Sequence, residues 1–358
     1  MTPHTLSLQP PADVVRQQVV ATIRERWIAP QAPARRHAVA PQEADALAKA
    51  VLDAMLTRPF RISKLPQEEE YAQLLAKVRY WVGKGKSVRI TLGYAPMKNL
   101  NAVRVSRADW SEFFALTHLC TWHNKVAAVY PPGLRIKIIF DDSTVSMANR
   151  PDRRHMDNYI ASIGRLIKVL GYEAFIVGTM RQSSFAWLFH FGFYQVAEWR
   201  VRRFERDPAN QALVEQMTTF ARRNLLLPPG LDEEARERAY REASHRYRVY
   251  WEALQLSGVS KHGHSLIGMY LDGNQHHIRQ QAALHLATLG KEQVTQPWQG
   301  EGALQDNGKG KLVPFVLTAG RRARMTCQEI GGLDLVPMEG FESIQVCREA
   351  AQNEAAAS

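Results

Sequence analysis

Residues 87–101 read SVRITLGYAPMKNLN, and they have the pattern of a strand that ends in a turn. Val88, Ile90 and Leu92 alternate with polar residues, as in a half-buried β-strand, and the glycine and proline that follow break the pattern. In α/β proteins, the loop that leaves the carboxyl end of a strand is where ligands usually bind. This loop carries Lys98, whose charged ammonium could bind a phosphate. If burial lowers its pKa, the neutral amine could instead act as a nucleophile. An ordinary solvated surface lysine is the alternative.

Further strands follow at the spacing of a βαβ unit. Residues 108–130 have a long helical pattern, which the sequence YPPG ends, and the strand LRIKIIF begins at Leu134. A third strand is expected in EAFIVGT, residues 173–179. The alternation of strand, helix and strand predicts a crossover connection and a partly parallel sheet. We therefore predict an α/β fold with a Rossmann-like mixed sheet flanked by helices.

The rest of the chain is predicted to add helices and then more strands. We expect an N-terminal helical region at 1–60, an α/β catalytic domain at 61–320 and a C-terminal tail at 321–358. The catalytic domain includes a helical insertion at 182–256, which begins with the aromatic run SSFAWLFHFGFYQVAEW. We assign this run to buried core, with a ligand pocket as the alternative. From residue 265 the patterns LIGMYLDG, AALHLATLG and LVPFVLTAG predict a C-terminal strand-rich part.

Composition places the 358-residue chain among soluble globular proteins, with 45% hydrophobic and 23% charged residues. No run has the length of a membrane span, and the first residues lack the order of a signal peptide. The three cysteines, Cys120, Cys327 and Cys347, are widely spaced and form no CxxC pair. We therefore expect neither a disulfide framework nor a cysteine-built zinc site, and we expect a cytoplasmic protein.

The net charge of +11 fits nucleic acid, an anionic surface or an anionic small substrate as the partner. The basic residues are scattered among acidic residues on predicted helices and form no stripe with interleaved aromatic residues. We therefore expect small-molecule substrates, with no nucleic-acid partner and no membrane partner. The oligomeric state is left open.

Two further loops carry candidate functional residues. Asp141 and Asp142 follow the strand LRIKIIF and would orient substrate amines or hydroxyls, or form an ordinary turn. His277 and Arg279 follow LIGMYLDG and share one face of an extended segment. The arginine could bind a phosphate by charge-assisted hydrogen bonds while the histidine transfers a proton. Neither loop has the spacing of metal ligands, so we expect no metal and no other cofactor.

Four segments resemble motifs of one family, in the same order and over about Val88 to Gly302. TLGYAPMKNLN is similar to a G-F-P-F-K-S-P-N loop, and YPPG followed by RIKIIFDDSTVSM is similar to Y-P-P-G-x-x-x-x-x-x-x-D-G-R-V-F-S-D. HHIRQQ and TQPWQG are similar to I-R-L-S and T-P-W-H elements. The family is that of the isocyanide (isonitrile) synthases, the pyoverdine/dityrosine biosynthesis proteins.

The resemblance implies a cofactor-independent enzyme of secondary metabolism. Such an enzyme joins the amino group of a tyrosine- or tryptophan-like amino acid to ribulose 5-phosphate, whose ketone carbon becomes the isonitrile carbon. Lys98, Asp141 and Arg279 fall on matching positions, so we expect Lys98 and Arg279 to bind phosphate or carboxylate and Asp141 to orient the amine. The candidate catalytic residues are Lys98, Asp141 and His277, and the candidate substrate-binding residues are Asn101, Asp142, Arg279 and Trp298.

The sequence also departs from the family's motifs. Asp142 stands where the family has glycine, Met147 where it has a second aspartate, and Gln299 where it has the histidine of T-P-W-H. These replacements favour an alternative, in which the chain is a divergent or non-catalytic member of the family that binds a related small molecule.

Overall fold

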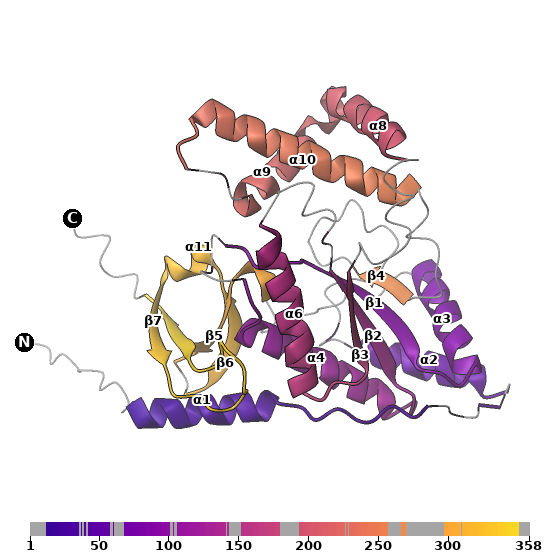
Figure 1. Cartoon of the computed structure of the whole chain (residues 1–358). Coiled ribbons are helices and arrows are strands. Elements are labelled where there is room, and N and C mark those ends of the chain that lie inside the picture. The colour runs from indigo at the N-terminus through magenta and orange to yellow at the C-terminus, as the bar shows by residue number, and fades with distance from the viewer. Residues whose placement is uncertain are drawn as a thin grey trace, which may run out of the picture.

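A computed structural model describes residues 12–35, 37, 39–40, 42–57, 60, 68–100, 103, 106–140, 142, 152–179, 193–225, 227, 229–256, 266–269, 297–308 and 310–350. Over these residues the chain forms two four-stranded sheets and a separate group of helices (Figure 1). None of the described helices is both long enough and apolar enough to cross a bilayer.

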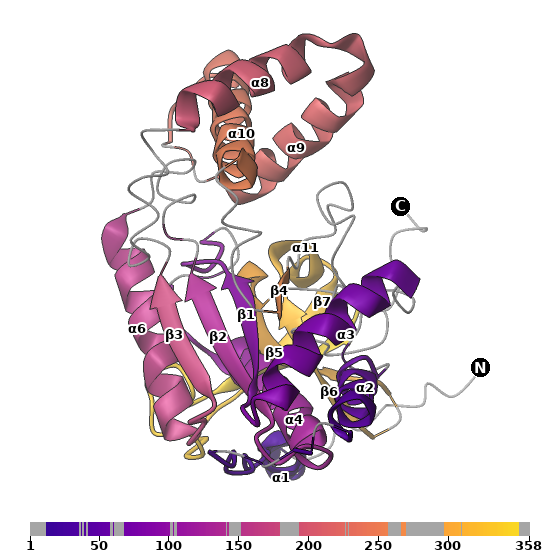
Figure 2. The ribbon, with the colours of Figure 1, turned by 90° about the vertical axis from the view of Figure 1, so that its right-hand side faces the viewer.

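The first sheet is built from the strands that the hydrophobic alternation predicts. Its order is β3-β2-β1-β4, and all of its strand pairs are parallel. The strands are β1 (Val88–Tyr94), β2 (Leu134–Phe140), β3 (Phe175–Thr179) and β4 (Leu266–Met269). Because the strands are parallel, their carboxyl ends meet at one edge, which is the edge that faces the helical group in Figure 2. The predicted α/β class is confirmed.

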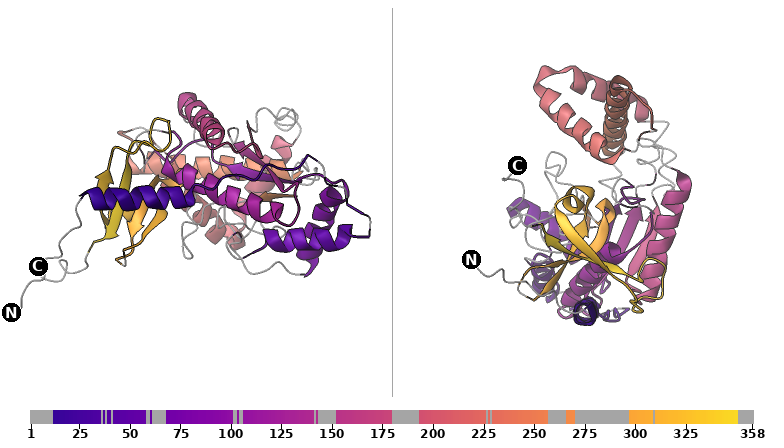
Figure 3. Two further views of the ribbon diagram at one scale, coloured as in Figure 1. Left: turned by 90° about the horizontal axis from the view of Figure 1, so that it is seen from below. Right: turned by 90° about the vertical axis from the view of Figure 1, so that its left-hand side faces the viewer.

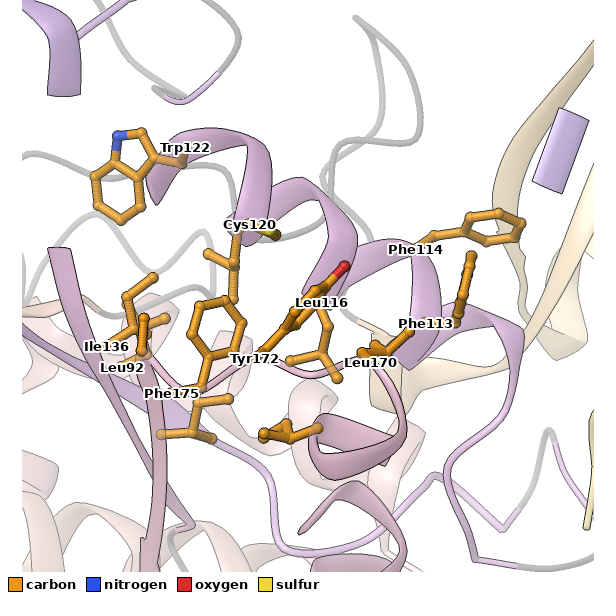
Figure 4. Packing of buried hydrophobic residues seen from close by; sticks show 14 of the residues in the cluster. Leu92, Phe113, Phe114, Leu116, Cys120, Trp122, Ile136, Leu170, Tyr172 and Phe175 are labelled. Carbon is orange, nitrogen blue, oxygen red and sulfur yellow. The ribbon is translucent and has the colours of Figure 1, made fainter. Parts of the chain in front are cut away.

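Helices flank this sheet (Figure 2). Those of the first half of the chain are α2 (Ala44–Met55), α3 (Glu68–Gly83), α4 (Trp110–Ala127) and α6 (Arg153–Val169), whereas α1 (Ala12–Arg26) contacts α4 and lies beneath the second sheet in Figure 1. The most deeply buried of them is α4, which contacts β2 of the first sheet and β5 and β6 of the second. In Figure 4, Phe113 and Phe114 lie on the side of α4 toward the second sheet, whereas Leu92 and Ile136 lie on the side of the first sheet.

The second sheet has the order β6-β5-β8-β7 and is mixed, since β5 pairs with β8 in parallel and the other pairs are antiparallel. Its strands are β5 (Glu301–Asp306), β6 (Leu312–Leu317), β7 (Met325–Ile330) and β8 (Ile344–Glu349), with the short helix α11 (Ala319–Arg322) between β6 and β7. The segment predicted as a C-terminal tail, 321–358, therefore contributes the two strands β7 and β8 to this sheet. The sequence MTCQEI conceals its strand because one face of β7 is exposed and polar.

A disulfide joins Cys327 and Cys347, which are directly paired residues of β7 and β8 with Cα atoms 4.0 Å apart. This corrects the expectation, drawn from wide spacing, that the cysteines would not pair. The two cysteines are 20 positions apart in sequence, and the pairing of the two strands brings them together. Cys120, on α4, is free and buried.

The helical group consists of α8 (Tyr194–Arg206), α9 (Gln211–Asn224) and α10 (Glu233–Leu256), with a 3-10 turn, η2 (Pro208–Asn210), between α8 and α9. It lies at one end of the molecule (Figure 3) and confirms the predicted helical insertion. The aromatic run was assigned to core, but its described end is exposed: Phe193 by 39% and Trp199 by 61%. Residues 183–192 of that run lie outside the described residues.

Candidate functional site

Lys98 lies in the loop that leaves β1, and its side chain is completely buried. The ammonium Nζ is 2.7 Å from Oδ2 of Asp109 and 2.9 Å from Oε2 of Glu112. It also lies 2.8 Å from both Ser111 Oγ and the carbonyl oxygen of Gly300. An ammonium has three hydrogens, so these protein oxygens use its full donor capacity.

The two carboxylates belong to the first turn of α4, where they form a capping box. The Asp109 side chain accepts from the backbone N–H of Ser111, and the Glu112 side chain accepts from the backbone N–H of Asp109. Such a box satisfies backbone donors that a helix start leaves unpaired. Here it also aims both carboxylates at Lys98. Tyr159 of α6 donates to the other Glu112 oxygen at 2.8 Å.

The second sheet closes this cluster from the other side. The Asp109 carboxylate accepts from the backbone N–H of Gly302 in β5 at 3.1 Å. A Cβ atom at Gly302 would come within 2.1 Å of the Ser111 backbone nitrogen, so only glycine lets β5 approach the helix start this closely. The 3-10 turn η3 (Pro297–Gln299) precedes β5 and adds the carbonyl of Pro297, which accepts from Ser111 Oγ at 2.9 Å.

The combined effect of burial, neighbouring charges and hydrogen bonds leaves the pKa values of both Glu112 and Lys98 raised. Burial raises the pKa of Glu112 to about 7, although Lys98 partly opposes the shift. Burial alone would lower the pKa of Lys98, but the charges and hydrogen bonds of Asp109 and Glu112 outweigh it and leave that pKa raised. Lys98 therefore stays charged, whereas Glu112 can hold or release a proton near neutral pH, as a general acid–base group must.

Aromatic side chains line the same edge of the sheet. Tyr94, the last residue of β1, makes edge-on contacts with Trp298 and Phe140 at ring-centroid distances of 4.5 and 5.6 Å. Phe140 in turn lies edge-on to Tyr159 at 6.2 Å. The carboxyl ends of β1 and β2, the start of α4 and the turn η3 thus converge on one site, where water is largely excluded.

The structure brings together some of the residues predicted from the sequence. Lys98 and Trp298 lie at this site, and the backbone N–H of Asn99 donates to the Trp298 carbonyl at 2.8 Å. Asp142 is buried just beyond β2, at the same edge of the sheet. The other predicted residues lie outside the described part of the chain, and their roles stay predictions: Asn101, Asp141, His277 and Arg279, as well as Met147.

Sequence reasoning missed Glu112, Tyr94 and Tyr159. The pattern D-W-S-E at 109–112 is a capping-box signature, but it predicts only the start of a helix. Nothing in the sequence shows that this start is buried against Lys98. Among the residues that the structure describes, no three His, Cys, Asp or Glu side chains are arranged to hold a metal ion.

Comparisons with known proteins agree with this architecture. The sequence profile of the family described as "Pyoverdine/dityrosine biosynthesis protein" matches residues 78–255, which include β1, α4, β2, β3 and the helical group. The fold is similar to the crystal structure of the PvcA protein from Pseudomonas aeruginosa, with a TM-score of 0.64 and 17% sequence identity. That similarity covers 84% of this chain and 99% of the other. Among curated proteins, no sequence matches the chain significantly.

Proposed function

Because this chain belongs to the pyoverdine/dityrosine biosynthesis family, we propose that it is a biosynthetic enzyme of the isonitrile synthase type. Its substrates are a tyrosine- or tryptophan-like amino acid, whose nitrogen becomes the isonitrile nitrogen, and ribulose 5-phosphate, which supplies the isonitrile carbon. The observation that supports this proposal most strongly is the buried cluster of Lys98, Asp109 and Glu112. It lies within the matched region, at the edge of a parallel sheet where ligands of α/β proteins usually bind.

The proposed reaction needs groups that move protons where water is scarce. An amine that attacks a ketone must lose protons, and the ketone oxygen must gain protons before it leaves as water. Glu112 suits this task because its pKa is about 7 and because Tyr159 and Lys98 hold its two oxygens in place. Lys98 then acts by fixing and stabilising the carboxylates.

This arrangement changes the part that Lys98 was expected to play. Its ammonium already contacts two carboxylates, so a phosphate at the same position would meet strong repulsion from Asp109 and Glu112. The sugar phosphate therefore requires another cation. Arg279 stays the sequence-based candidate for that role.

The test is product analysis after incubation with ribulose 5-phosphate and a panel of amino acids, read by mass spectrometry. We expect an isonitrile from at least one aromatic amino acid. Glu112→Gln should lower kcat by about 10²- to 10⁴-fold, the usual contribution of a general acid–base group. A wild-type protein that forms no isonitrile from any amino acid with this sugar phosphate would refute the proposal.

The replacement at Gln299 favours a second candidate function. Gln299 lies in η3, directly beside Trp298, where the family motif has a histidine able to transfer protons. A protein that binds both substrates but turns over neither would be a binding or regulatory member of the family. Calorimetric binding without product in the same assay would support this second function.

A further inference from the structure

The hydroxyl of Tyr94 is an exception among the buried tyrosines of the described residues. Tyr94 is only 3% exposed, yet its hydroxyl has no hydrogen-bond partner there. By contrast, the hydroxyls of Tyr130, Tyr159 and Tyr172 donate to Lys86 O, Glu112 Oε1 and Ile28 O. A buried hydroxyl without a partner costs free energy, and folded proteins leave few of them. The exception therefore suggests that a ligand supplies the missing partner.

The position of Tyr94 fits that explanation. It ends β1, so it stands at the carboxyl edge of the parallel sheet, and edge-on contacts with Trp298 and Phe140 fix the orientation of its ring. Burial, followed by the nearby charges of Glu112 and Asp109, raises the pKa of Tyr94 well above its usual range. The hydroxyl is therefore neutral, with a proton to donate and lone pairs to accept.

The charges around this hydroxyl select the kind of ligand group that can lie beside it. Among the residues that the structure describes, one cation, Lys98, faces two carboxylates, Asp109 and Glu112, and its hydrogens are already used by protein oxygens. When Glu112 is ionised, the cluster carries excess negative charge. A phosphate or carboxylate would be repelled there, whereas an ammonium group would be attracted and could donate to the Tyr94 oxygen.

We propose that Tyr94 is a substrate-binding residue whose hydroxyl oxygen accepts a hydrogen bond from the amino group of a primary-amine substrate, next to Glu112. This inference rests on the proposed function, in which that amine is the amino acid, and deepens it. It places the amine beside β1 and α4 and the sugar phosphate elsewhere. The amine then lies within reach of Glu112, the group proposed to exchange its protons.

The decisive variant is Tyr94→Phe, which removes a single oxygen. Binding is measured by calorimetry, without ribulose 5-phosphate, for tyrosine, tryptophan, tyramine and tryptamine. Their counterparts without the amino group, 3-(4-hydroxyphenyl)propionate and 3-(indol-3-yl)propionate, serve as reference ligands. We expect the variant to bind the amines about tenfold more weakly, since a hydrogen bond to a charged group is lost. Binding of the reference ligands should not change, and Tm should stay constant or rise because a partnerless hydroxyl has been removed.

Tyr130→Phe is the matched control. Tyr130 is fully buried and its hydroxyl donates to the carbonyl of Lys86 at 2.9 Å, just before the amino end of β1 and away from the site. This control should lower Tm and leave amine binding unchanged.

The inference is overturned if the wild-type protein binds none of the amines, or if Tyr94→Phe binds them as tightly as the wild type. It is also overturned if Tyr94→Phe weakens the binding of amines and of reference ligands equally. A Tm that falls, as expected for Tyr130→Phe, with amine binding unchanged would overturn it too. Failure of the proposed function gives a different result. In that case amines bind and Tyr94→Phe weakens them selectively, but no isonitrile forms when the sugar phosphate is added.

Discussion

Two clusters of ion pairs in this protein differ in how deeply they are buried. In the site cluster, Lys98 and Glu112 have no exposed side-chain surface, and Lys98 is the one cation beside both carboxylates within the described part of the chain. In the interhelical cluster, His245 of α10 lies between Glu198 and Glu205 of α8, and its side chain is 23% exposed. All three interhelical side chains are partly exposed to water, whereas in the site cluster only Asp109 is, by 17%.

The interhelical cluster is also redundant. Glu205 accepts from Arg248 as well as His245, and Glu198 accepts from Arg202. Losing one cation there leaves another beside each carboxylate, and water can replace the rest. Among the described residues the site cluster has no second cation, and burial makes a charge that loses its counter-ion there costly. We therefore expect hydrogen bonds of similar length to contribute different free energies in the two clusters.

The largest effect is expected when the site cluster loses its cation. Lys98→Met removes the only cation that contacts Asp109 and Glu112 among the described residues. Breaking a buried ion pair from one side should lower the free energy of unfolding by about 3–5 kcal/mol. Urea denaturation measures this change. Adding Glu112→Gln should recover part of the loss, and a single-variant cost below about 1 kcal/mol would show that water reaches the cluster.

The next effect concerns pH. The pKa of Glu112 rises from 4.5 to about 7 on folding, so the folded state holds the proton more tightly. Its contribution to stability is therefore full below pH 4.5 and falls as pH rises toward 7, by on the order of 2–3 kcal/mol. The wild-type and Glu112→Gln free energies of unfolding should diverge across this window. Parallel curves would contradict a folding-linked shift of this carboxyl.

His245 should show a smaller effect in a higher pH window. The hydrogen bonds that His245 donates to Glu205 raise the pKa of His245 above 6.5; partial burial opposes this rise, and Glu198 adds to it. Its stabilisation is therefore present below pH 6.5 and is lost as pH rises through the folded-state pKa. Because water and the neighbouring arginines also stabilise Glu198 and Glu205, His245→Gln should lower the free energy of unfolding by only about 1 kcal/mol. Faster hydrogen exchange in α8 and α10, with no change around α4, is the expected readout.

The smallest change in stability is expected for an exposed ion pair, with which both clusters can be compared. Arg153 and Asp157 form an exposed pair one turn apart on α6, with an N···O distance of 3.5 Å. Exposed pairs of this kind contribute about 0.5 kcal/mol or less, because salt and water screen them. Arg153→Ala should therefore shift the urea midpoint hardly at all. A loss comparable to that of His245→Gln would mean that exposure does not separate the clusters.

The sequence predicted elements whose hydrophobic residues repeat at a regular period. LRIKIIF became β2 because every second side chain enters the core, and the helical pattern before it became α4. It did not predict β5, EGALQD, or β7, MTCQEI, because few of their residues are apolar. Strands of that kind are stabilised by their neighbours, which a local pattern cannot show.

Of the residues at the candidate site, Lys98 and Trp298 were proposed from the sequence, but the carboxylates that surround the lysine were not. Lys98 could be found because it follows a strand, and loops at strand ends carry function. Glu112 has the local environment of an ordinary helix cap. Its burial depends on Tyr159 and on the close approach of β5 at Gly302, both of which are tertiary contacts.

The hydrogen bond from Lys98 to the Gly300 carbonyl has a consequence for how the chain folds. It closes a loop of 202 residues, and about a third of that loop is the helical group of 193–256. Loop-closure entropy grows only logarithmically, at about 0.6 kcal/mol for each doubling of length, so the helical group adds less than that to the ordering of the site. Helices can therefore be gained or lost there over evolution with little effect on the lysine. The lysine itself cannot complete its hydrogen bonds until the segment that leads into the second sheet docks against the start of α4.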